Sequence, residues 1–337
     1  MPKLIAGLRV AAVSAALPQV RTSRGDFDLL FSDLDVQRIA RNAGIKQVHL
    51  AGHPATVELC EVAVRDLMMR SNIAPESIDG LVLVTQAAET SMLASSANLA
   101  RKLGLRADVV VFDLSCACSC YIYGLYQAAM LVKAGGCRRV LMCTSDMISE
   151  PLAPQRHGMK LVFASAATCT LVEQGDDELA FDFDTGIDPA PIFRSSISYD
   201  DIDTDKAYRQ AFEVESEGLI NFAFEKVPYM ITRFLASQQR KLEEVPYFLL
   251  HQASAFMLHY VARKLGIAPE KIPKEVAGVC KAGPSSIPLM LTHHQQLQNM
   301  QQDQVIACGF GGGFSVSVCR LSLGQAHIHA PVYVQAP

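Results

Sequence analysis

The chain has 337 residues, a formal net charge of −4 at pH 7 and 50% hydrophobic residues. This length favours two domains over one core. The mild negative charge and the lack of a basic stripe argue against nucleic acid as a partner. No apolar run reaches the ~18 residues of a membrane span, so we expect no membrane partner.

The first element is expected to be an apolar strand that ends near Pro18. Residues 1–18 superficially resemble a secretory signal, but Arg9 interrupts the apolar run and leaves only Val10–Leu17 as a hydrophobic region. Most of the ten cysteines lie within apolar segments, where cysteine acts as a small hydrophobic side chain. We therefore expect a reducing compartment and a cytoplasmic protein.

Helices and buried strands alternate in the next part of the chain. Thr56–Met69 has the apolar spacing of a helix, Gly80–Gln86 is a short apolar run, and Leu99–Leu105 is helical again. An apolar run of this length suits a parallel strand that is buried on both faces. The alternation predicts parallel strands covered by helices.

The segment Phe112–Gly124 is the most informative one. An apolar run ends in small residues and three alternate cysteines, Cys116, Cys118 and Cys120, and a helical pattern then begins. A turn residue in this place lies at a helix N-terminus, where N–H groups and the helix dipole stabilise a thiolate. One cysteine is thus a candidate nucleophile. Structural zinc sites use paired Cys-x₂₋₄-Cys ligands, so we expect no metal here.

Two further features lie between residues 140 and 208. Val140–Thr144 is another short apolar run and predicts a buried strand. Phe181–Tyr208 is rich in aspartate and irregular in pattern, so we expect a solvated loop, with a lid over a pocket as the alternative.

Three segments of the first half recur about 165 residues later, in the same order of strand and helix types. The matched pairs are Gly80–Gln86 with Pro246–Gln252, Leu99–Leu105 with Val261–Ile267, and Val140–Thr144 with Val305–Gly309. A helical pattern at Phe222–Gln239 precedes the second set. The sequence therefore predicts two similar α/β halves, which we set at residues 1–173 and 174–337.

The repeat also predicts where polar groups meet. The turn at Cys118 corresponds to the segment around Lys281, and His251 lies at the end of its strand. Functional groups in α/β sheets gather at the carboxyl ends of strands. These three side chains are thus expected to face one cleft between the halves.

From about residue 4 to residue 323 the chain resembles the β-ketoacyl-ACP synthase III family of the thiolase-like superfamily. The family's Phe-Asp-x₄-Cys segment matches Phe112–Cys118, its His-Gln-Ala-Asn segment matches His251–Ser254, and its Phe-Gly-Gly-Gly-Phe segment matches Phe310–Phe314. The resemblance selects Cys118 among the three cysteines. It implies a five-layered α-β-α-β-α sandwich, with the nucleophile in the first half and the histidine and glycine loop in the second.

The resemblance also implies roles for these residues. Cys118 would take an acyl group from a thioester, His251 would act as a base or hydrogen-bond donor, and the N–H groups of Cys118 and Gly312 would form an oxyanion hole. The residues implied to bind substrate are Phe163, Phe310, Gly311 and Gly313. Acyl-CoA or acyl carrier protein would be the substrate, and no cofactor is implied. Cys116 and Cys120 are expected to be small residues beside the nucleophile, with a spacing that invites oxidation.

The sequence departs from the family pattern at several places, among them Cys120-Tyr121, where the family has Gly-Phe after the nucleophile. Lys281 stands where decarboxylating members have an asparagine that stabilises the enolate of a malonyl thioester. Because lysine is longer and its charge is costly to bury, this replacement weakens the expectation of malonyl decarboxylation and leaves acylation of the cysteine unaffected. The family's Gly-rich Phe-Gly-Asp-Gly-Ala-Gly-Ala stretch is altered at Phe163–Cys169. The chain also has no tryptophan to stack on the adenine of CoA, as several relatives do, so a carrier-bound donor is at least as expected as free CoA.

Two functions remain open at this point. The first is acyl transfer through Cys118, either by carbon–carbon condensation in fatty-acid, polyketide or secondary-metabolite synthesis, or to an oxygen or nitrogen nucleophile without decarboxylation. The second is a non-catalytic subunit that pairs with an active paralogue. The resemblance implies a homodimer that forms through the strand near the catalytic segment, or a heterodimer with such a paralogue.

Overall fold

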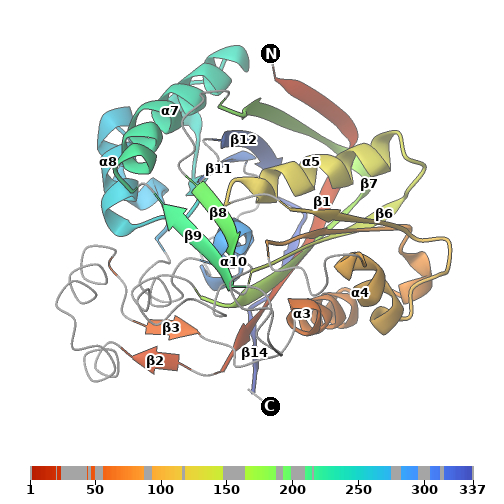
Figure 1. The fold of residues 1–337 in the computed structure, drawn as a ribbon. Helices are drawn as coiled ribbons and strands as arrows, with labels where there is room; N and C mark the ends of the chain where they lie inside the picture. The colour runs from red at the N-terminus through yellow and green to blue at the C-terminus, as the bar shows by residue number, and fades with distance from the viewer. Residues whose placement is uncertain are drawn as a thin grey trace.

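The protein is an α/β structure built around one large mixed sheet (Figure 1). The computed structural model describes residues 2–19, 21–23, 44, 47–49, 56–86, 93–115, 118–146, 164–186, 193–198, 209–214, 216–274, 282–294, 304–311 and 315–335. Of the helices in these ranges, none is both long and apolar enough to span a membrane.

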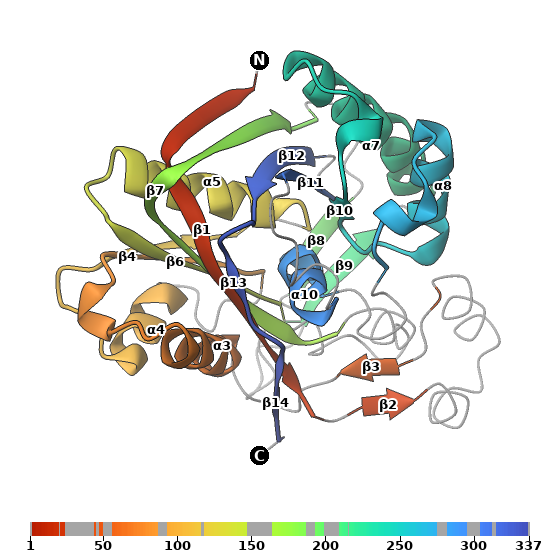
Figure 2. The ribbon, with the colours of Figure 1, turned by 180° about the vertical axis from the view of Figure 1, so that it is seen from behind.

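The described strands fall into one ten-stranded sheet and two small pairs. The main sheet has the order β10-β11-β12-β7-β6-β4-β5, and β1 pairs with β7, β13 and β14 (Figure 2). Its strands are β1 (Lys3–Pro18), β4 (Gly80–Val84), β5 (Val110–Leu114), β6 (Arg139–Asp146), β7 (Ala166–Asp184), β10 (Phe248–Leu250), β11 (Gln304–Gly311), β12 (Ser315–Ser322), β13 (His327–Ile328) and β14 (Val332–Val334). The small pairs are β2 (Arg21–Ser23) with β3 (Gln47–His49), and β8 (Phe193–Ser198) with β9 (Arg209–Val214).

The helices pack in three layers that alternate with the strands. They are α3 (Thr56–Arg70), α4 (Ser95–Leu103), α5 (Cys120–Lys133), α7 (Ser216–Ser237), α8 (Ala255–Leu265) and α10 (Ser286–His293). In one buried cluster, α3 and α4 pack on the outer face of β4 and β6. In a second cluster, α5 and α10 lie between these strands and the strands β11 and β12. In a third cluster, α7 and α8 pack on the outer face of β10–β12. These clusters confirm the predicted α-β-α-β-α layers.

The apolar run in β4 shows why the sequence forms a strand with two covered faces. Leu81 and Leu83 enter the cluster with α3 and α4, whereas Val82 and Val84 enter the cluster with α5. Successive side chains of a strand point to opposite faces, so a strand between two helix layers is apolar at every position.

The predicted repeat is present in the structure. β4 pairs in parallel with β5 and β6, and β10 pairs in parallel with β11. The matched helices α4 and α8 both end at a glycine in the left-handed region, Gly104 with φ 68° and Gly266 with φ 67°. Glycine adopts this conformation without the Cβ penalty of other residues, so the shared Leu-Gly ends both helices in the same way.

β7 is the longest strand, with 19 residues, and it joins the two sets of parallel strands. Its first part pairs with β6, its last part pairs with β12, and β1 runs antiparallel along most of its length. The predicted division between residues 173 and 174 falls inside this strand and stays a prediction.

The expectation of an irregular loop over Phe181–Tyr208 is wrong for the described part of that segment. Its first residues belong to β7, and β8 forms a hairpin with β9. Asp182 pairs with Arg233 at 2.8 Å, and Asp184 pairs with Lys226 at 3.5 Å, so both carboxylates face α7. These two aspartates therefore bind α7 to β7 through ion pairs and do not belong to a solvated loop. The lid alternative concerns residues that lie outside the described ranges.

Candidate active site

The turn before α5 holds Cys118. β5 ends at Leu114 and α5 begins at Cys120, so the predicted strand, turn and helix are present. Among the described cysteines that are not in disulfides, Cys118 is half-buried and the other six are buried. Burial raises the pKa of the Cys308 and Cys319 thiols, which makes them poor nucleophiles. Cys118 is therefore the candidate nucleophile by exposure as well as by position.

The other cysteines of the turn differ from Cys118. Cys120 is buried and disulfide-bonded. Cys116 lies outside the described residues. Within the described ranges, no three or more His, Cys, Asp or Glu side chains are grouped so that they could hold a metal ion.

Asp113 fixes the end of β5 that leads into the turn. Its carboxylate accepts hydrogen bonds from the backbone N–H groups of Ser95 and Ser96, at 2.6 and 2.8 Å. These are first-turn N–H groups of α4, whose N-cap residue, Ala94, offers no side-chain cap. Asp113 on β5 thus caps the N-terminus of α4, and a negative charge is favourable at a helix N-terminus.

The glycines of β11 allow this strand to pass very close to the turn. A Cβ on Gly311 would lie 2.8 Å from the Cβ of Cys118, and one on Gly309 would lie 2.7 Å from the carbonyl oxygen of Ser119. Real Cβ atoms essentially never come within 3.0 Å of another heavy atom. Only glycine leaves this approach open.

β11 also connects the turn with His251. The N–H of His251 donates to the carbonyl of Cys308 at 2.9 Å and so continues the pairing of β10 with β11. The imidazole is 3% exposed and meets the ring of Phe310 edge-on, with centroids 5.5 Å apart. Because Phe310 and Gly311 are neighbours, one strand end contacts both Cys118 and His251.

Buried hydroxyl groups anchor the turn that follows the Lys281 segment. Ser285 Oγ lies 2.8 Å from Thr144 Oγ1, which lies 2.6 Å from Thr168 Oγ1, and Ser285 also donates to the carbonyl of Ala166 at 3.3 Å. These contacts hold the short 3₁₀ turn Gly283–Ser285 against β6 and β7. Thr168 belongs to the stretch that is glycine-rich in the resembled family.

Four of the predicted site residues lie outside the described residues: Lys281, Phe163, Gly312 and Gly313. The described ones, Cys118, His251, Phe310 and Gly311, come together at one end of the sheet; their roles remain predictions. The hydroxyl groups around them leave no signal in the sequence, because a buried serine or threonine in a strand resembles any small residue until its partner is known.

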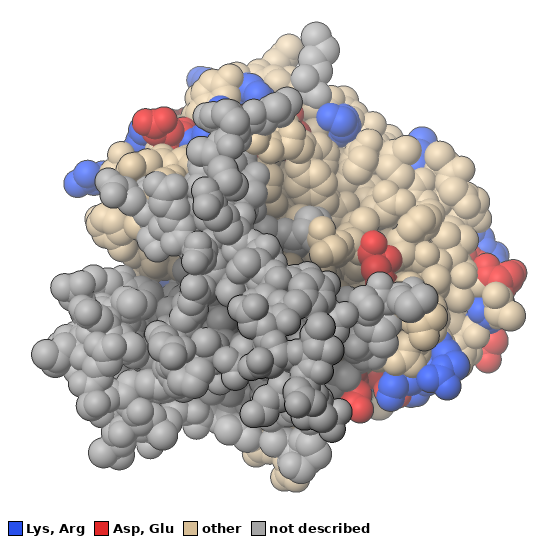
Figure 3. All heavy atoms as spheres, in the orientation of Figure 1, with Lys and Arg blue, Asp and Glu red and all other residues tan. Residues whose placement is uncertain are grey.

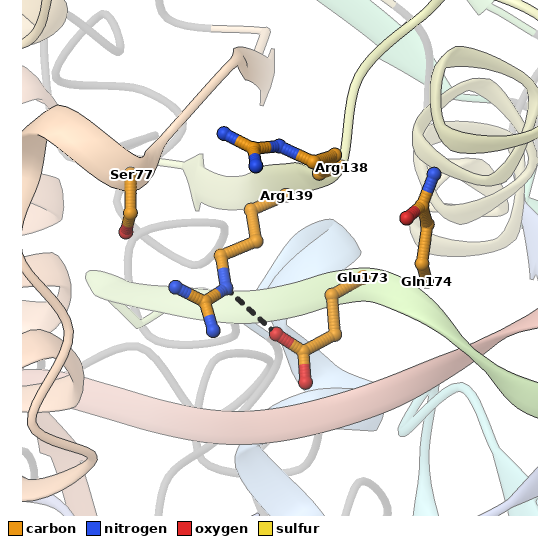
Figure 4. A pocket seen from close by; sticks show the side chains of 5 residues that line it. All are labelled: Ser77, Arg138, Arg139, Glu173 and Gln174. Carbon is orange, nitrogen blue, oxygen red and sulfur yellow. Dashed lines mark hydrogen bonds and ion pairs between the residues drawn. The ribbon is translucent and has the colours of Figure 1, made fainter.

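An open cavity of about 370 Å³ lies at the other end of the sheet. It is lined by Ser77, Arg138, Arg139, Glu173 and Gln174 (Figure 4). Arg139 begins β6, whereas Cys118 follows the carboxyl end of β5, and both strands run parallel to β4. Ligands of α/β sheets bind at the carboxyl ends of strands, so this cavity is not the candidate active site.

Glu173 in this cavity is expected to make stability depend on pH. Burial alone would raise its pKa, but hydrogen bonds and charges from Arg139 and Arg9 outweigh burial and lower the pKa below 4.5. The group thus stabilises the fold above pH 4.5, and this contribution is lost as the pH falls through the lowered pKa. We expect Glu173→Gln to cost about 1–3 kcal/mol at pH 7 and less in acid. Urea unfolding between pH 3 and 7 measures this difference.

The control for that series is Glu61→Gln, which breaks an exposed pair with Arg65 at 2.8 Å. Such surface pairs contribute about 0–1 kcal/mol, so the control should stay close to the parent protein. An equal acid sensitivity of Glu173→Gln and the parent protein would contradict the prediction.

Comparisons with known proteins agree with the geometry of the candidate site. The family model described as 3-oxoacyl-[acyl-carrier-protein (ACP)] synthase III matches residues 112–189, and the model of its C-terminal part matches residues 235–322. The first match begins at the Cys118 segment, and the second contains His251 and the glycines of β11.

Whole-chain relatives extend this likeness. β-Ketoacyl-[acyl-carrier-protein] synthase III of Lactococcus lactis is 26% identical over 325 residues, which is 94% of this chain and 99% of the relative. The crystal structure of 3-oxoacyl-(acyl-carrier protein) synthase from Burkholderia xenovorans superposes with a TM-score of 0.91 at 24% identity and covers 99% of both chains. A 2.1 Å structure of a 3-oxoacyl-(acyl-carrier-protein) synthase III gives a TM-score of 0.85 at 25% identity, over 93% of this chain and 99% of the other. The five layers are thus those of the thiolase-like fold, and the chain is similar to the β-ketoacyl-ACP synthase III proteins in both matched segments and over nearly its whole length.

Proposed function

We propose that the protein is an acyltransferase of the β-ketoacyl-ACP synthase III type and that Cys118 carries the acyl group. The observation that supports this most is the environment of Cys118. Cys118 is half-buried and not in a disulfide, it lies in the turn that leads into α5, and its Cβ lies beside Gly311. A helix N-terminus stabilises a thiolate, and the glycine lets the backbone of β11 come close to the nucleophile.

In the first step, the Cys118 thiolate attacks the carbonyl carbon of an acyl thioester. A new carbon–sulfur bond forms, the bond to the donor's sulfur breaks, and the donor leaves as a thiolate that takes up a proton. The N–H groups of Cys118 and Gly312 stabilise the negative oxygen of the intermediate. His251 serves as the base or hydrogen-bond donor.

In the second step, the acyl group passes to a carbon nucleophile. Loss of CO₂ from a malonyl thioester supplies an enolate, whose carbon attacks the acyl-cysteine and releases the Cys118 thiolate. The family asparagine that stabilises this enolate is replaced by Lys281. A second outcome is therefore kept in the proposal, in which the acyl group passes to an oxygen or nitrogen nucleophile. Release of CO₂ from malonyl thioester by the acylated protein separates the two.

The donor is an acyl-CoA or an acyl carrier protein in this proposal, and the working form is a homodimer in the cytoplasm. β5 forms one end of the strand order, and Phe112 on it is 41% exposed, so a second copy can extend the sheet there. Figure 3 shows a broad area with few charges on the side where Figure 1 places α5, which suits an interface between copies.

The test is the mass of the intact protein after incubation with acyl-CoA or with acyl carrier protein. We expect an increase by one acyl group that maps to the peptide of Cys118 and is absent from Cys118→Ala. If neither donor produces an adduct, acyl transfer is wrong and the alternative of a non-catalytic subunit with a paralogous partner gains support.

A further inference from the structure

The cavity at the amino ends of β4 and β6 has more hydrogen-bond donors than acceptors. Arg139 donates from its Nε to Glu173 at 2.8 Å, and within the described residues its two terminal NH₂ groups have no hydrogen-bond partner. The Arg138 side chain is 71% exposed, and its Nε lies 3.9 Å from Asp79, which is too far for a hydrogen bond. In Figure 4 both guanidinium groups extend from the start of β6 toward the side where Ser77 lies. Both arginines therefore present donors to the cavity.

Glu173 is the acidic residue of the cavity lining, and both of its oxygens are already bound. Oε1 accepts from Arg9 at 2.6 and 3.1 Å, and Oε2 accepts from Arg139 at 2.8 Å. Its negative charge is thus compensated by two guanidinium groups. The Gln174 side chain makes no hydrogen bond within the described residues, so its amide adds a further donor to the lining.

Positive charge exceeds negative charge around the cavity. Asp79 pairs with Arg106 at 3.3 Å, and Asp108 pairs with the same arginine at 2.9 Å. Asp79 also accepts from the backbone N–H groups of residues 138 and 139, at 2.7 and 3.2 Å. Together with Glu173 and its two partners, this set has three carboxylates and four arginines, and Arg138 is the arginine without a carboxylate within hydrogen-bond distance. An anion that entered the cavity would balance this excess.

The donors and the size of the cavity favour a phosphate group that is carried by a small molecule. A guanidinium offers its N–H groups in a planar fork that matches two oxygens of a phosphate, and such charge-assisted bonds are stronger than neutral ones. The volume of about 370 Å³ has room for about a dozen waters at ~30 Å³ each, so it exceeds what a single inorganic phosphate fills. A cavity of this volume is typical of sites for small organic ligands.

We propose that this cavity binds the phosphate group of a small organic phosphate monoester, with the guanidinium groups of Arg138 and Arg139 as the main contacts and the Gln174 amide as a further donor. The cavity lies at the opposite end of the sheet from Cys118, so it is separate from the candidate active site. The inference does not depend on the proposed function, because binding in this cavity needs no acyl donor and no reaction at Cys118.

The test is isothermal titration calorimetry with glycerol 3-phosphate, in a phosphate-free buffer of constant ionic strength. We expect the parent protein to bind this monoester and Arg138→Gln to raise its Kd about 10–100-fold, because hydrogen bonds between charged groups are lost. Gln174→Glu places a negative charge in the lining and should weaken binding at least as much. Both side chains are exposed, so both variants are expected to fold.

Arg101→Gln is the matched control, because it replaces an exposed arginine that donates to Asn98 at 2.9 Å and does not line the cavity. Its Kd should stay within about twofold of the parent value. Inorganic phosphate should bind more weakly than glycerol 3-phosphate, and glycerol should not bind. Equal binding of the two phosphates would overturn the monoester and assign the cavity to free phosphate. Absence of binding of either phosphate by the parent protein, or an equal Kd in the parent protein and Arg138→Gln, would overturn the whole inference.

Discussion

Gly311→Ala is expected to lower the rate of Cys118 acylation by about 10²-fold while the protein stays folded. The added Cβ would lie 2.8 Å from the Cβ of Cys118, whereas ordinary contacts begin at 3.4 Å. The backbone of β11 and the turn at Cys118 must therefore separate by about 0.6 Å. A shift of this size at the nucleophile displaces it from the substrate carbonyl. Single-turnover acylation, followed by intact mass, measures the rate.

Gly175→Ala is the matched control for this prediction. Its Cβ would also meet an atom at 2.8 Å, but that atom belongs to the flexible side chain of Arg9, which can move aside. We expect an acylation rate within about twofold of the parent protein, because the change is remote from Cys118. Equal rates for Gly311→Ala and Gly175→Ala would show that the close approach of β11 is unimportant for the reaction.

Phe181→Ala is expected to cause the largest loss of stability, about 3–5 kcal/mol. The ring is 0% exposed, lies 5.3 Å from the ring of Tyr126 on α5 and stacks at 6.3 Å on Phe183. Its backbone pairs with β1 on one side and with β12 on the other. The cavity left by the ring therefore opens where the central helix layer meets the strand shared by both halves. Urea unfolding at pH 7 measures the loss.

Phe256→Ala provides the comparison, because this phenylalanine on α8 is 57% exposed. Truncation there removes little buried area, and we expect a change within about 0.5–1 kcal/mol. A loss for Phe181→Ala no greater than that of Phe256→Ala would contradict the importance of the β7 core.

Much of the fold could be predicted because buried parallel strands and amphipathic helices leave strong patterns. The predicted strand Gly80–Gln86 contains β4, which ends at Val84. The predicted helix Thr56–Met69 is α3 to within one residue, and the first strand ends at Pro18. The internal repeat also predicted which elements of the two halves correspond to each other. The helices α4 and α8 are one such pair, and both end with Leu-Gly. These features depend on local periodicity and local backbone preference, which the sequence carries directly.

The acidic segment and the hydroxyl contacts could not be predicted in this way. The aspartates of β7 read as solvated until Arg233 and Lys226, more than 40 residues later, are placed beside them. The hydroxyl oxygens of Ser119 and Ser315 lie 2.6 Å apart, although the two residues are 196 positions apart in the chain and show no shared pattern. Partners at such separations are set by tertiary packing, which composition and spacing do not encode. The candidate site was found by its motifs, and its supporting hydrogen bonds were not.

The pairing of β1 with β13 and β14 also bears on how the protein is made. Ala12 lies in register with His327 and Ala16 with Val332, so the first strand is completed by residues more than 300 positions further on. Contacts of such high sequence separation form slowly, and synthesis proceeds from the N-terminus at about 5–20 residues per second. The edge of β1 that β13 and β14 cover therefore keeps unpaired N–H and C=O groups until those strands have been synthesised. During that interval this edge is a place where another chain could pair, even when β7 already covers the opposite edge.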